Sequence, residues 1–156
     1  MTRQEMIDAI VKECHNQGIT KPEAIQYVLA TVQHETNNTF KPVKEAYWLS
    51  EKWRKKNLRY YPYYGRGLVQ ITWKSNYEKF GKLLGIDLVK KPDLALEPGN
   101  AIFILVYGMK HGVFTGKKLD DYFNSKGSNF IKARKIINGK DKAKKIAALA
   151  QDIAIG

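Results

Sequence analysis

The segment that most constrains the fold is residues 98–111, PGNAIFILVYGMKH, which is apolar on nearly every side. Proline is tolerated in the first turn of a helix, and Gly112 follows the segment as a helix terminator. A helix that is hydrophobic all round must be surrounded by other elements. The sequence therefore predicts a central helix over 98–111, with the rest of the chain packed around it.

Five further segments have apolar residues at every third or fourth position, which indicates amphipathic helices. They are 2–14, 22–36, 44–57, 74–85 and 141–154. The first opens with TRQE, a capping box between Thr2 and Glu5, and TKPE before the second helix matches the same motif. Residues 58–72, LRYYPYYGRGLVQIT, contain proline and glycine and end in an alternating pattern, so we expect a loop with a small hairpin. We predict a mainly α, single-domain chain over residues 1–156.

The chain is strongly basic, with 27 Lys and Arg against 15 Asp and Glu, a net charge of +12. Such a charge attracts polyanions, whether nucleic acid, anionic lipid or an anionic cell wall, and does not choose among them. No apolar run approaches the roughly 20 residues of a membrane span. The segment MTRQEMIDAIVKEC carries acids and does not resemble a secretory signal. The single cysteine, Cys14, lies on an apolar helix stripe and is expected to be a buried thiol.

An acidic residue interrupts the apolar stripe of the second predicted helix. Val28, Val32 and Glu35 follow one another by steps of four and three, so Glu35 should point inward in the last turn. A carboxyl beside apolar neighbours is suited to be a general acid, although most glutamates at helix ends simply face solvent. A zinc-binding H-E-x-x-H motif is excluded because its second histidine is replaced by Asn38.

Two further glutamates follow closely, and either could form a pair with Glu35. Glu45 lies beyond a short turn, and Glu51 comes one turn of helix after Tyr47, among basic residues. Hydrolysis of a glycosidic bond needs one protonated carboxyl and one ionised carboxylate, and inversion requires roughly 6.5–9.5 Å between them. The spacing favours Glu45, and it leaves Glu51 open as a rival.

The aromatic segment that follows, YYPYYGRGLVQITWKSNY, combines flat rings with amides and hydroxyls. This composition suits sugar binding, because sugar rings present both apolar faces and hydroxyl edges. Aromatic rings interleaved with Arg59, Arg66 and Lys74 also fit a looser description of a nucleic-acid surface. We expect about half of the rings to be core packing.

Four ordered blocks of the sequence resemble the family 19 glycoside hydrolases, in particular their short phage and prophage endolysins. The blocks are HET, YYGRGLVQITWKSNY, GIDLVKKPDLALEP and ARKIINGKD. The resemblance covers about residues 30–141. It implies a lysozyme-like, two-lobed fold and inverting hydrolysis of a β-1,4-linked polymer that contains N-acetylglucosamine, with no metal or cofactor.

The resemblance also implies roles for individual residues. Glu35 matches the general acid, Glu45 the second acid, and Thr72 the hydroxyl residue that helps hold the attacking water. Substrate binding is expected at His34, Tyr64, Arg66, Gln70, Trp73, Asn76, Arg134 and Asn138.

The short length and the positive charge move the expected substrate from chitin to the glycan strands of bacterial peptidoglycan, which are anionic. We expect a monomeric endolysin, made in the cytoplasm of a host bacterium without a signal peptide and acting on the cell wall after release. A chitinase is the first alternative. A non-enzymatic cationic binder of nucleic acid or of a membrane surface is the second, and the basic ending KDKAKKIAALAQDIA could make a weak membrane contact.

Overall fold

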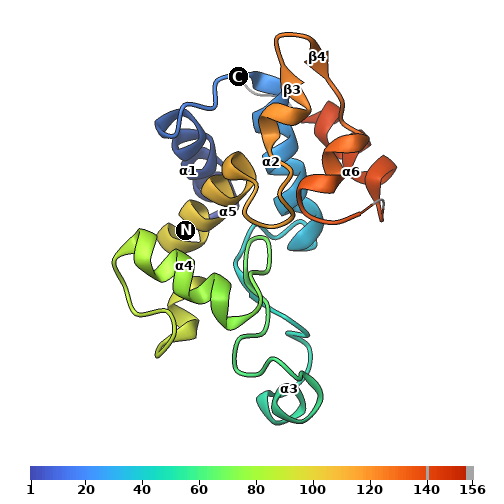
Figure 1. The fold of residues 1–156 in the computed structure, drawn as a ribbon. Coiled ribbons are helices and arrows are strands. Elements are labelled where there is room, and N and C mark those ends of the chain that lie inside the picture. The colour runs from blue at the N-terminus through green and yellow to red at the C-terminus, as the bar shows by residue number, and fades with distance from the viewer. Residues whose placement is uncertain (140, 154–156) are drawn as a thin grey trace.

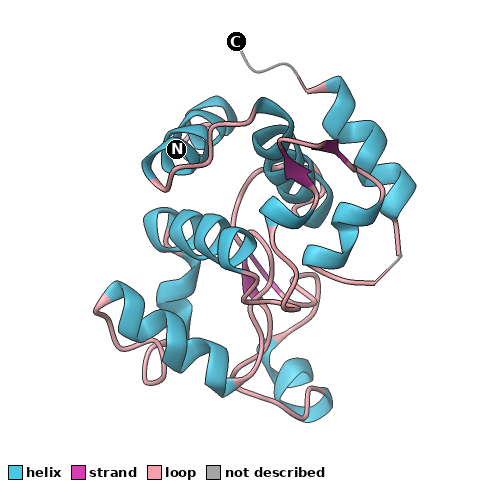
Figure 2. Ribbon diagram, turned by 45° about the horizontal axis from the view of Figure 1, so that its top comes forward, coloured by secondary structure: helices cyan, strands magenta, loops and turns pink. Residues whose placement is uncertain are grey.

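The computed structural model describes residues 1–139 and 141–153. In this part of the chain the α-helices are α1 (Arg3–Asn16), α2 (Pro22–Glu35), α3 (Glu51–Asn57), α4 (Lys74–Leu84), α5 (Pro98–His111) and α6 (Ala143–Asp152). Short 3-10 helices are η1 (Pro92–Leu96), η2 (Leu119–Asp121) and η3 (Lys132–Ile136). Two antiparallel pairs join β1 (Val43–Lys44) to β2 (Arg66–Gly67) and β3 (Phe123–Asn124) to β4 (Gly127–Ser128). The prediction of a mainly α fold with a small β region is confirmed (Figure 2).

Helix α5 lies between two apolar clusters and contributes side chains to both. Leu105 and Val106 belong to the larger cluster, which is built with α1, α2, α6 and η3, whereas Ile104 belongs to the smaller one, built with α4 and η1. In Figure 1, α1, α2 and α6 lie on one side of α5, and α3 and α4 lie on the other. The predicted central helix is thus confirmed, and it joins two lobes.

The starts of α1 and α2 differ from each other. The capping box at α1 is confirmed: the Thr2 hydroxyl accepts from the Glu5 N–H at 3.1 Å, and the Glu5 carboxylate accepts from the Thr2 N–H at 2.9 Å. The second predicted capping box is wrong, because α2 begins after Lys21 without a side-chain cap. Lys21 Nζ instead donates to the carbonyl of Asn124 at 2.6 Å, which ties the β3–β4 hairpin to the start of α2.

The helix predicted over 44–57 is wrong in its first half. Val43–Lys44 is paired with β2, and Ala46 has a φ of +51°, which no helix permits. The helix starts only after Ser50, whose hydroxyl accepts from the N–H of Trp53 at 3.1 Å. Residues 45–50 therefore lie outside the helix, and they place Glu45 beside the loop that follows α3.

The predicted hairpin in 58–72 is reduced to one residue pair. Arg66 and Ile71 exchange two backbone hydrogen bonds, at 3.1 and 3.2 Å, and the strand pairing of this loop is with β1 instead. Leu68, Val69 and Ile71 are all buried, so both faces of the loop are packed and its alternating pattern does not mark a solvent-facing strand.

Helix α6 packs along α2 and buries Ile146, Ala147 and Ala150. The helix predicted over 141–154 is found at Ala143–Asp152. The last residue of the predicted range, 154, lies outside the described part of the chain. The β3–β4 hairpin was not predicted. Within residues 1–139 and 141–153, no helix is both long enough and apolar enough to cross a bilayer.

Cys14 is fully buried in α1, as predicted. Burial raises the pKa of its thiol to about 12. A thiol with such a pKa remains protonated near neutral pH, so it packs as a small apolar side chain.

Candidate active site

Glu35 is the last residue of α2, on the helix face that carries the buried Val28 and Val32. The helix ends here because the hydroxyl of Thr36 donates to the Val32 carbonyl at 2.7 Å and accepts from the N–H of Phe40 at 2.9 Å. The Glu35 side chain is 21% exposed. The inward direction inferred from the helical spacing is therefore confirmed, with enough exposure for a ligand to reach the carboxyl.

The partner of Glu35 is Arg134, from η3. Glu35 Oε1 lies 3.4 Å from Nη1 of Arg134, whose side chain is only 4% exposed. The Arg134 Nε donates to the backbone carbonyl of Asp141 at 2.7 Å, which holds the guanidinium in place. The expectation of mainly apolar neighbours for Glu35 is corrected: a buried cation stands beside it.

Tyr27 and His34, which lie near this pair, have shifted pKa values. The hydroxyl of Tyr27 is buried and has no hydrogen-bond partner among the described residues, and burial raises its pKa although Arg134 opposes this. Burial lowers the pKa of the His34 imidazole; Glu35 opposes the shift, and the charges of Arg134, Lys145 and Lys142 reinforce it. His34 is thus favoured in its neutral form beside Glu35.

Glu45 is held by two donors from the loop that follows α3. Its Oε1 accepts from the N–H of Gly65 at 2.9 Å, and its Oε2 accepts from the Tyr60 hydroxyl at 2.5 Å. The backbone N–H of Glu45 also donates to the Gly65 carbonyl at 2.7 Å, continuing the β1–β2 pairing. Both carboxylate oxygens are therefore fixed in direction, as a catalytic base requires.

Glu51 is engaged differently, as an anchor for α3. Its carboxylate accepts from Arg54 Nε at 3.0 Å, from the Tyr64 hydroxyl at 3.0 Å and from the Tyr61 hydroxyl at 2.8 Å. Burial tends to raise the pKa of Glu51, but the three hydrogen bonds and the nearby Lys44 outweigh it and lower the pKa. Glu51 is exposed and contacts Arg54, as expected for the solvated basic side, and the two tyrosine hydroxyls are contacts that the sequence did not indicate.

A close contact between Gly65 and Gln70 shapes the loop opposite Glu45. A Cβ atom on Gly65 would lie 2.6 Å from the Gln70 side-chain oxygen, so any larger residue would force the Gln70 side chain to shift. The Gln70 amide donates to the Val43 carbonyl at 2.7 Å, and its backbone has a φ of +54°. Gln70 therefore links the loop to β1 rather than pointing freely into solvent.

Four of the predicted site residues line one small cleft of about 180 Å³. They are Gln70, Thr72, Trp73 and Asn76, and the opposite wall includes Phe114 and Ile137. Trp73 is 47% exposed, and its ring packs on Tyr60 with the centroids 5.0 Å apart. An exposed ring beside amides and a hydroxyl is the surface that a sugar requires.

The Arg134–Asn138 block reaches this cleft through Ile137. Asn138 is exposed, its N–H donates to the Arg134 carbonyl at 2.9 Å, and its side-chain oxygen accepts from the N–H of Gly139. Its role in binding and the predicted separation of the Glu35 and Glu45 carboxyls stay predictions.

Strained backbone is concentrated around these residues. Within residues 1–139 and 141–153, the non-glycine residues with positive φ are Asn37, Asn38, Phe40, Ala46, Gln70, Trp73 and Lys142. All seven lie within a few residues of Glu35, of Glu45, of the cleft or of the Arg134 block. Such strain costs energy and tends to persist where a site requires it.

The prediction that Tyr64 binds substrate is wrong. Its side chain has no exposed surface, and its ring lies between the guanidiniums of Arg66, 3.8 Å away, and Arg54, 5.3 Å away. The ring is part of the support for the loop and offers no face to a ligand.

Arg66 is also buried, with 4% of its side chain exposed. Its Nε pairs with Asp93 at 2.8 Å, and Nη1 donates to the Pro62 carbonyl at 2.8 Å and to the Tyr77 hydroxyl at 3.0 Å. The prediction that Arg66 binds substrate is therefore wrong, because all of these contacts stabilise the loop internally.

Two residues of the site were not predicted. Tyr60 and Gly65 orient Glu45, and the sequence signals available were the aromatic run and the glycine of the Gly-Arg-Gly motif. Neither signal indicates that Tyr60 or Gly65 would contact Glu45.

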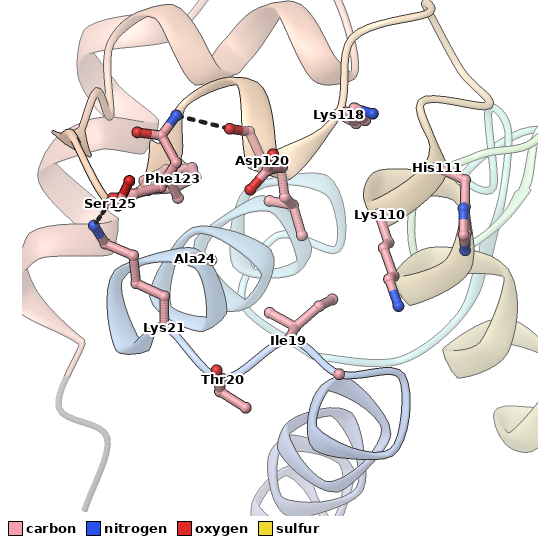
Figure 3. Close-up of a pocket in the computed structure, with 13 residues that line it drawn as sticks. Ile19, Thr20, Lys21, Ala24, Lys110, His111, Lys118, Asp120, Phe123 and Ser125 are labelled. Atoms are coloured by element: carbon pink, nitrogen blue, oxygen red, sulfur yellow. Dashed lines mark hydrogen bonds between the residues drawn. The ribbon is translucent and has the colours of Figure 1, made fainter.

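A hollow of about 590 Å³ lies at the opposite end of α2 from Glu35 (Figure 3). It is bordered by the α1–α2 connection, the end of α5 and β3, and none of the predicted site residues is among the described residues that line it. Its lysines Lys21 and Lys110 already donate to backbone carbonyls. Among the described residues, no group of three His, Cys, Asp or Glu side chains could hold a metal ion.

Comparison with known proteins gives short but close matches. Chitinase 8 of Oryza sativa subsp. japonica is 61% identical over 33 residues, 21% of this chain and 13% of that protein. Endochitinase CH5B of Phaseolus vulgaris is 56% identical over 32 residues, 20% of this chain and 10% of that protein. An inactive chitinase-like protein 1 of Hevea brasiliensis is 53% identical over 32 residues. The chain thus matches only about an eighth or less of the length of these relatives.

A crystal structure of a chitinase C mutant is similar with a TM-score of 0.49 and 21% sequence identity, over 81% of this chain and 73% of that one. The profile of the class I chitinase family matches residues 16–105, more than half of the 156 residues. The chain therefore belongs to glycoside hydrolase family 19.

Proposed function

We propose that the chain is an inverting glycoside hydrolase that cleaves β-1,4 linkages in the glycan strands of bacterial peptidoglycan. The observation that carries the proposal is the unequal support of two carboxyls, which accompany a cleft lined by Gln70, Thr72, Trp73 and Asn76. Glu35 is partly buried beside Arg134, and Glu45 has both oxygens oriented by Tyr60 and Gly65. Paired carboxyls with different surroundings suit an acid and a base.

In the proposed reaction, Glu35 donates its proton to the glycosidic oxygen as the bond to the anomeric carbon breaks. Glu45 removes a proton from a water molecule that attacks the same carbon from the opposite face, with Thr72 helping to hold that water. The carboxylate left on Glu35 is then stabilised by the Arg134 guanidinium. The Trp73 ring supports the sugar through its exposed face.

Peptidoglycan is preferred to chitin as the substrate because of charge. The chain carries a net charge of +12, and a neutral polymer such as chitin gains nothing from it. Chitin remains the second candidate, because the curated relatives include proteins named chitinases.

The test compares purified peptidoglycan with chitin, measuring new reducing ends and identifying the new terminal sugar by mass spectrometry. We expect release from peptidoglycan, and the terminal sugar identifies the bond that is cut. One relative, 53% identical over 32 residues, is named inactive, so activity on either polymer is itself an outcome of the test. A protein that releases sugar from neither polymer, and binds DNA in a steeply salt-dependent way, would instead be a cationic binder.

Three matched variants assign the roles. Glu35→Gln and Glu45→Gln should each lower the rate by roughly 10²–10⁴-fold, the usual contribution of general acid–base catalysis. Glu51→Gln should keep most of the activity, because its carboxylate serves Arg54, Tyr61 and Tyr64. A folded Glu35→Gln protein with the parent's rate contradicts the proposal. If Glu51→Gln loses activity while Glu45→Gln keeps it, the base is Glu51 and not Glu45.

A further inference from the structure

A second hollow of about 590 Å³ lies between η3 and the start of α6. Its lining residues are Ile131, Lys132, Lys135, Gly139, Lys142, Ala143, Lys144 and Lys145. Five of the eight are lysines, and among the described lining residues there is no Asp or Glu. We refer to it as the lysine hollow.

The five ammonium groups of the lysine hollow are not used by the fold. Among the described residues none of them makes an ion pair or a side-chain hydrogen bond, whereas two of the three lysines that line the other hollow, Lys21 and Lys110, are bound to carbonyls. Like charges gathered without counter-charges repel one another and lower stability. A negatively charged ligand would relieve that repulsion.

The lysine hollow borders the candidate active site through Arg134. This residue lies in η3 between Lys132 and Lys135, and its Nη1 approaches Glu35 at 3.4 Å. Its Nε donates to the carbonyl of Asp141, the residue before Lys142, at 2.7 Å. A single guanidinium therefore connects the proposed acid to the edge of the hollow.

Charge from the lysine hollow also reaches the residue next to the acid. Burial is the main cause of the lowered pKa of His34, and Lys142 and Lys145 contribute to it. A ligand bound at Glu35 is therefore within electrostatic reach of the lysines.

The chemistry of the two candidate glycans distinguishes them at this position. Chitin is neutral along its whole length. In peptidoglycan, alternate sugars carry a short peptide that ends in free carboxylates and contains small apolar side chains. Five ammoniums match the carboxylates, and Ile131, 47% exposed, provides apolar surface for the rest.

We propose that the lysine hollow binds the carboxylate-bearing peptide stem attached to the glycan strand, beside the bond that is cut. This inference rests on the proposed function and names the part of the substrate that gives peptidoglycan its advantage over chitin. Because the lysines are exposed, the attraction is screened by salt, and its effect should weaken as ionic strength rises.

The test uses a variant that combines Lys132→Gln, Lys135→Gln, Lys144→Gln and Lys145→Gln. The matched control combines Lys12→Gln, Lys79→Gln, Lys82→Gln and Lys90→Gln, which removes the same charge from exposed positions on α1, α4 and the following connection. Both are assayed on peptidoglycan freed of attached phosphate polymers by acid, with its stems intact or removed by an amidase. Removing the phosphate polymers ensures that any effect comes from peptide carboxylates.

We expect the hollow variant to lose about tenfold or more in kcat/KM on peptidoglycan with intact stems, mainly through a higher KM. Its loss on stem-free strands should be much smaller, and the control variant should respond alike to both substrates. In a second measurement, free stem peptide should inhibit the parent competitively and the hollow variant only weakly. Circular dichroism and thermal midpoints establish that both variants are folded.

Equal losses for the two variants, or equal losses on the two substrates, would overturn this inference and leave the proposed function standing. A parent that releases no sugar from either form of peptidoglycan overturns the proposed function, and the inference falls with it.

Discussion

Three glutamates close together in the sequence have three different surroundings. Glu35 is paired with a buried arginine, Glu45 is oriented by a hydroxyl and a backbone amide, and Glu51 joins α3 to two tyrosines. Residue type alone does not indicate which chemical role each of the three could have. Their hydrogen-bond partners do, and these partners favour Glu45 over Glu51 as the proposed base.

The lowered pKa of Glu51 predicts a pH-dependent contribution to stability. Since its folded pKa lies below the ordinary 4.5, the unfolded chain binds the proton more readily, and the contribution is present above about pH 4.5 and lost as the pH falls through the folded pKa. The side chain is 49% exposed, so solvent screening limits the contribution to about 1 kcal/mol or less. Urea unfolding of the parent and Glu51→Gln should differ at pH 7, and the difference should shrink as the pH falls below about 4.5.

The control for this prediction is Glu78→Gln, which removes an exposed carboxylate 4.0 Å from Lys74 in an i,i+4 pair. It should change the free energy of unfolding little at any pH. A Glu51→Gln effect that does not shrink at all as the pH is lowered from 7 to well below 4.5 would show that the carboxylate charge is not responsible.

At the residue scale, local sequence patterns predicted the direction of a side chain but not the distant residues that it contacts. The inward direction of Glu35 follows from helical spacing, which needs only its own helix. Its pairing with Arg134 joins residues 99 positions apart, and the burial of Tyr64 and Arg66 depends on surrounding carbonyls and rings. Sequence spacing carries no information about such contacts, so an arginine and a tyrosine inside a motif were both taken for ligand-binding residues.

Helix α5 contains two glycines with opposite surroundings. A Cβ on Gly108 would collide with the ring of Phe114, whereas a Cβ on Gly99 would meet no atom within 4 Å. Alanine is favoured over glycine in a helix by about 1 kcal/mol. At Gly108 the collision should exceed this gain.

We therefore predict that Gly99→Ala leaves the protein as stable or up to about 1 kcal/mol more stable, whereas Gly108→Ala destabilises it by about 1–3 kcal/mol. Equilibrium urea unfolding of the two variants measures the difference directly. If Gly108→Ala stabilises the protein as Gly99→Ala does, Phe114 moves aside without cost and the close packing there is unimportant.

At the element scale, long periodic helices were predicted and short elements were not. Helices α1, α2, α4 and α5 follow from apolar spacing and their end signals. The β1–β2 and β3–β4 pairs have two residues in each strand, and contacts from distant residues such as Lys21 maintain them. Elements this short lack a periodic pattern, which is why half of the helix predicted over 44–57 proved to be a strand and a turn.

The whole molecule consists of two apolar clusters that share α5. Tryptophans occur only at positions 48, 53 and 73, all in the lobe of α3 and α4, while most of the larger cluster belongs to α1, α2 and the shared helix α5. Tryptophan fluorescence therefore reports mainly on one lobe, and far-ultraviolet circular dichroism reports on the helices of both.

Leu105 is fully buried in the larger cluster, on the shared helix. We predict that Leu105→Ala lowers stability by about 2–5 kcal/mol and shifts the fluorescence and circular dichroism transitions together, as for a single cooperative unit. Leu83→Ala, at an exposed position on α4, is the control and should shift neither. Separate midpoints for the two signals would mean that the lobes unfold independently in spite of α5.

The enclosed Cys14 has a practical consequence for experiments on this protein. It is the only cysteine in the chain, and its sulfur is buried and protonated. A maleimide dye should therefore not react with the native protein. It should attach at a single engineered position such as Lys82→Cys, which lies on the outer surface of α4. The movement of individual labelled molecules over a cell envelope could then be followed without replacing any native side chain of the interior.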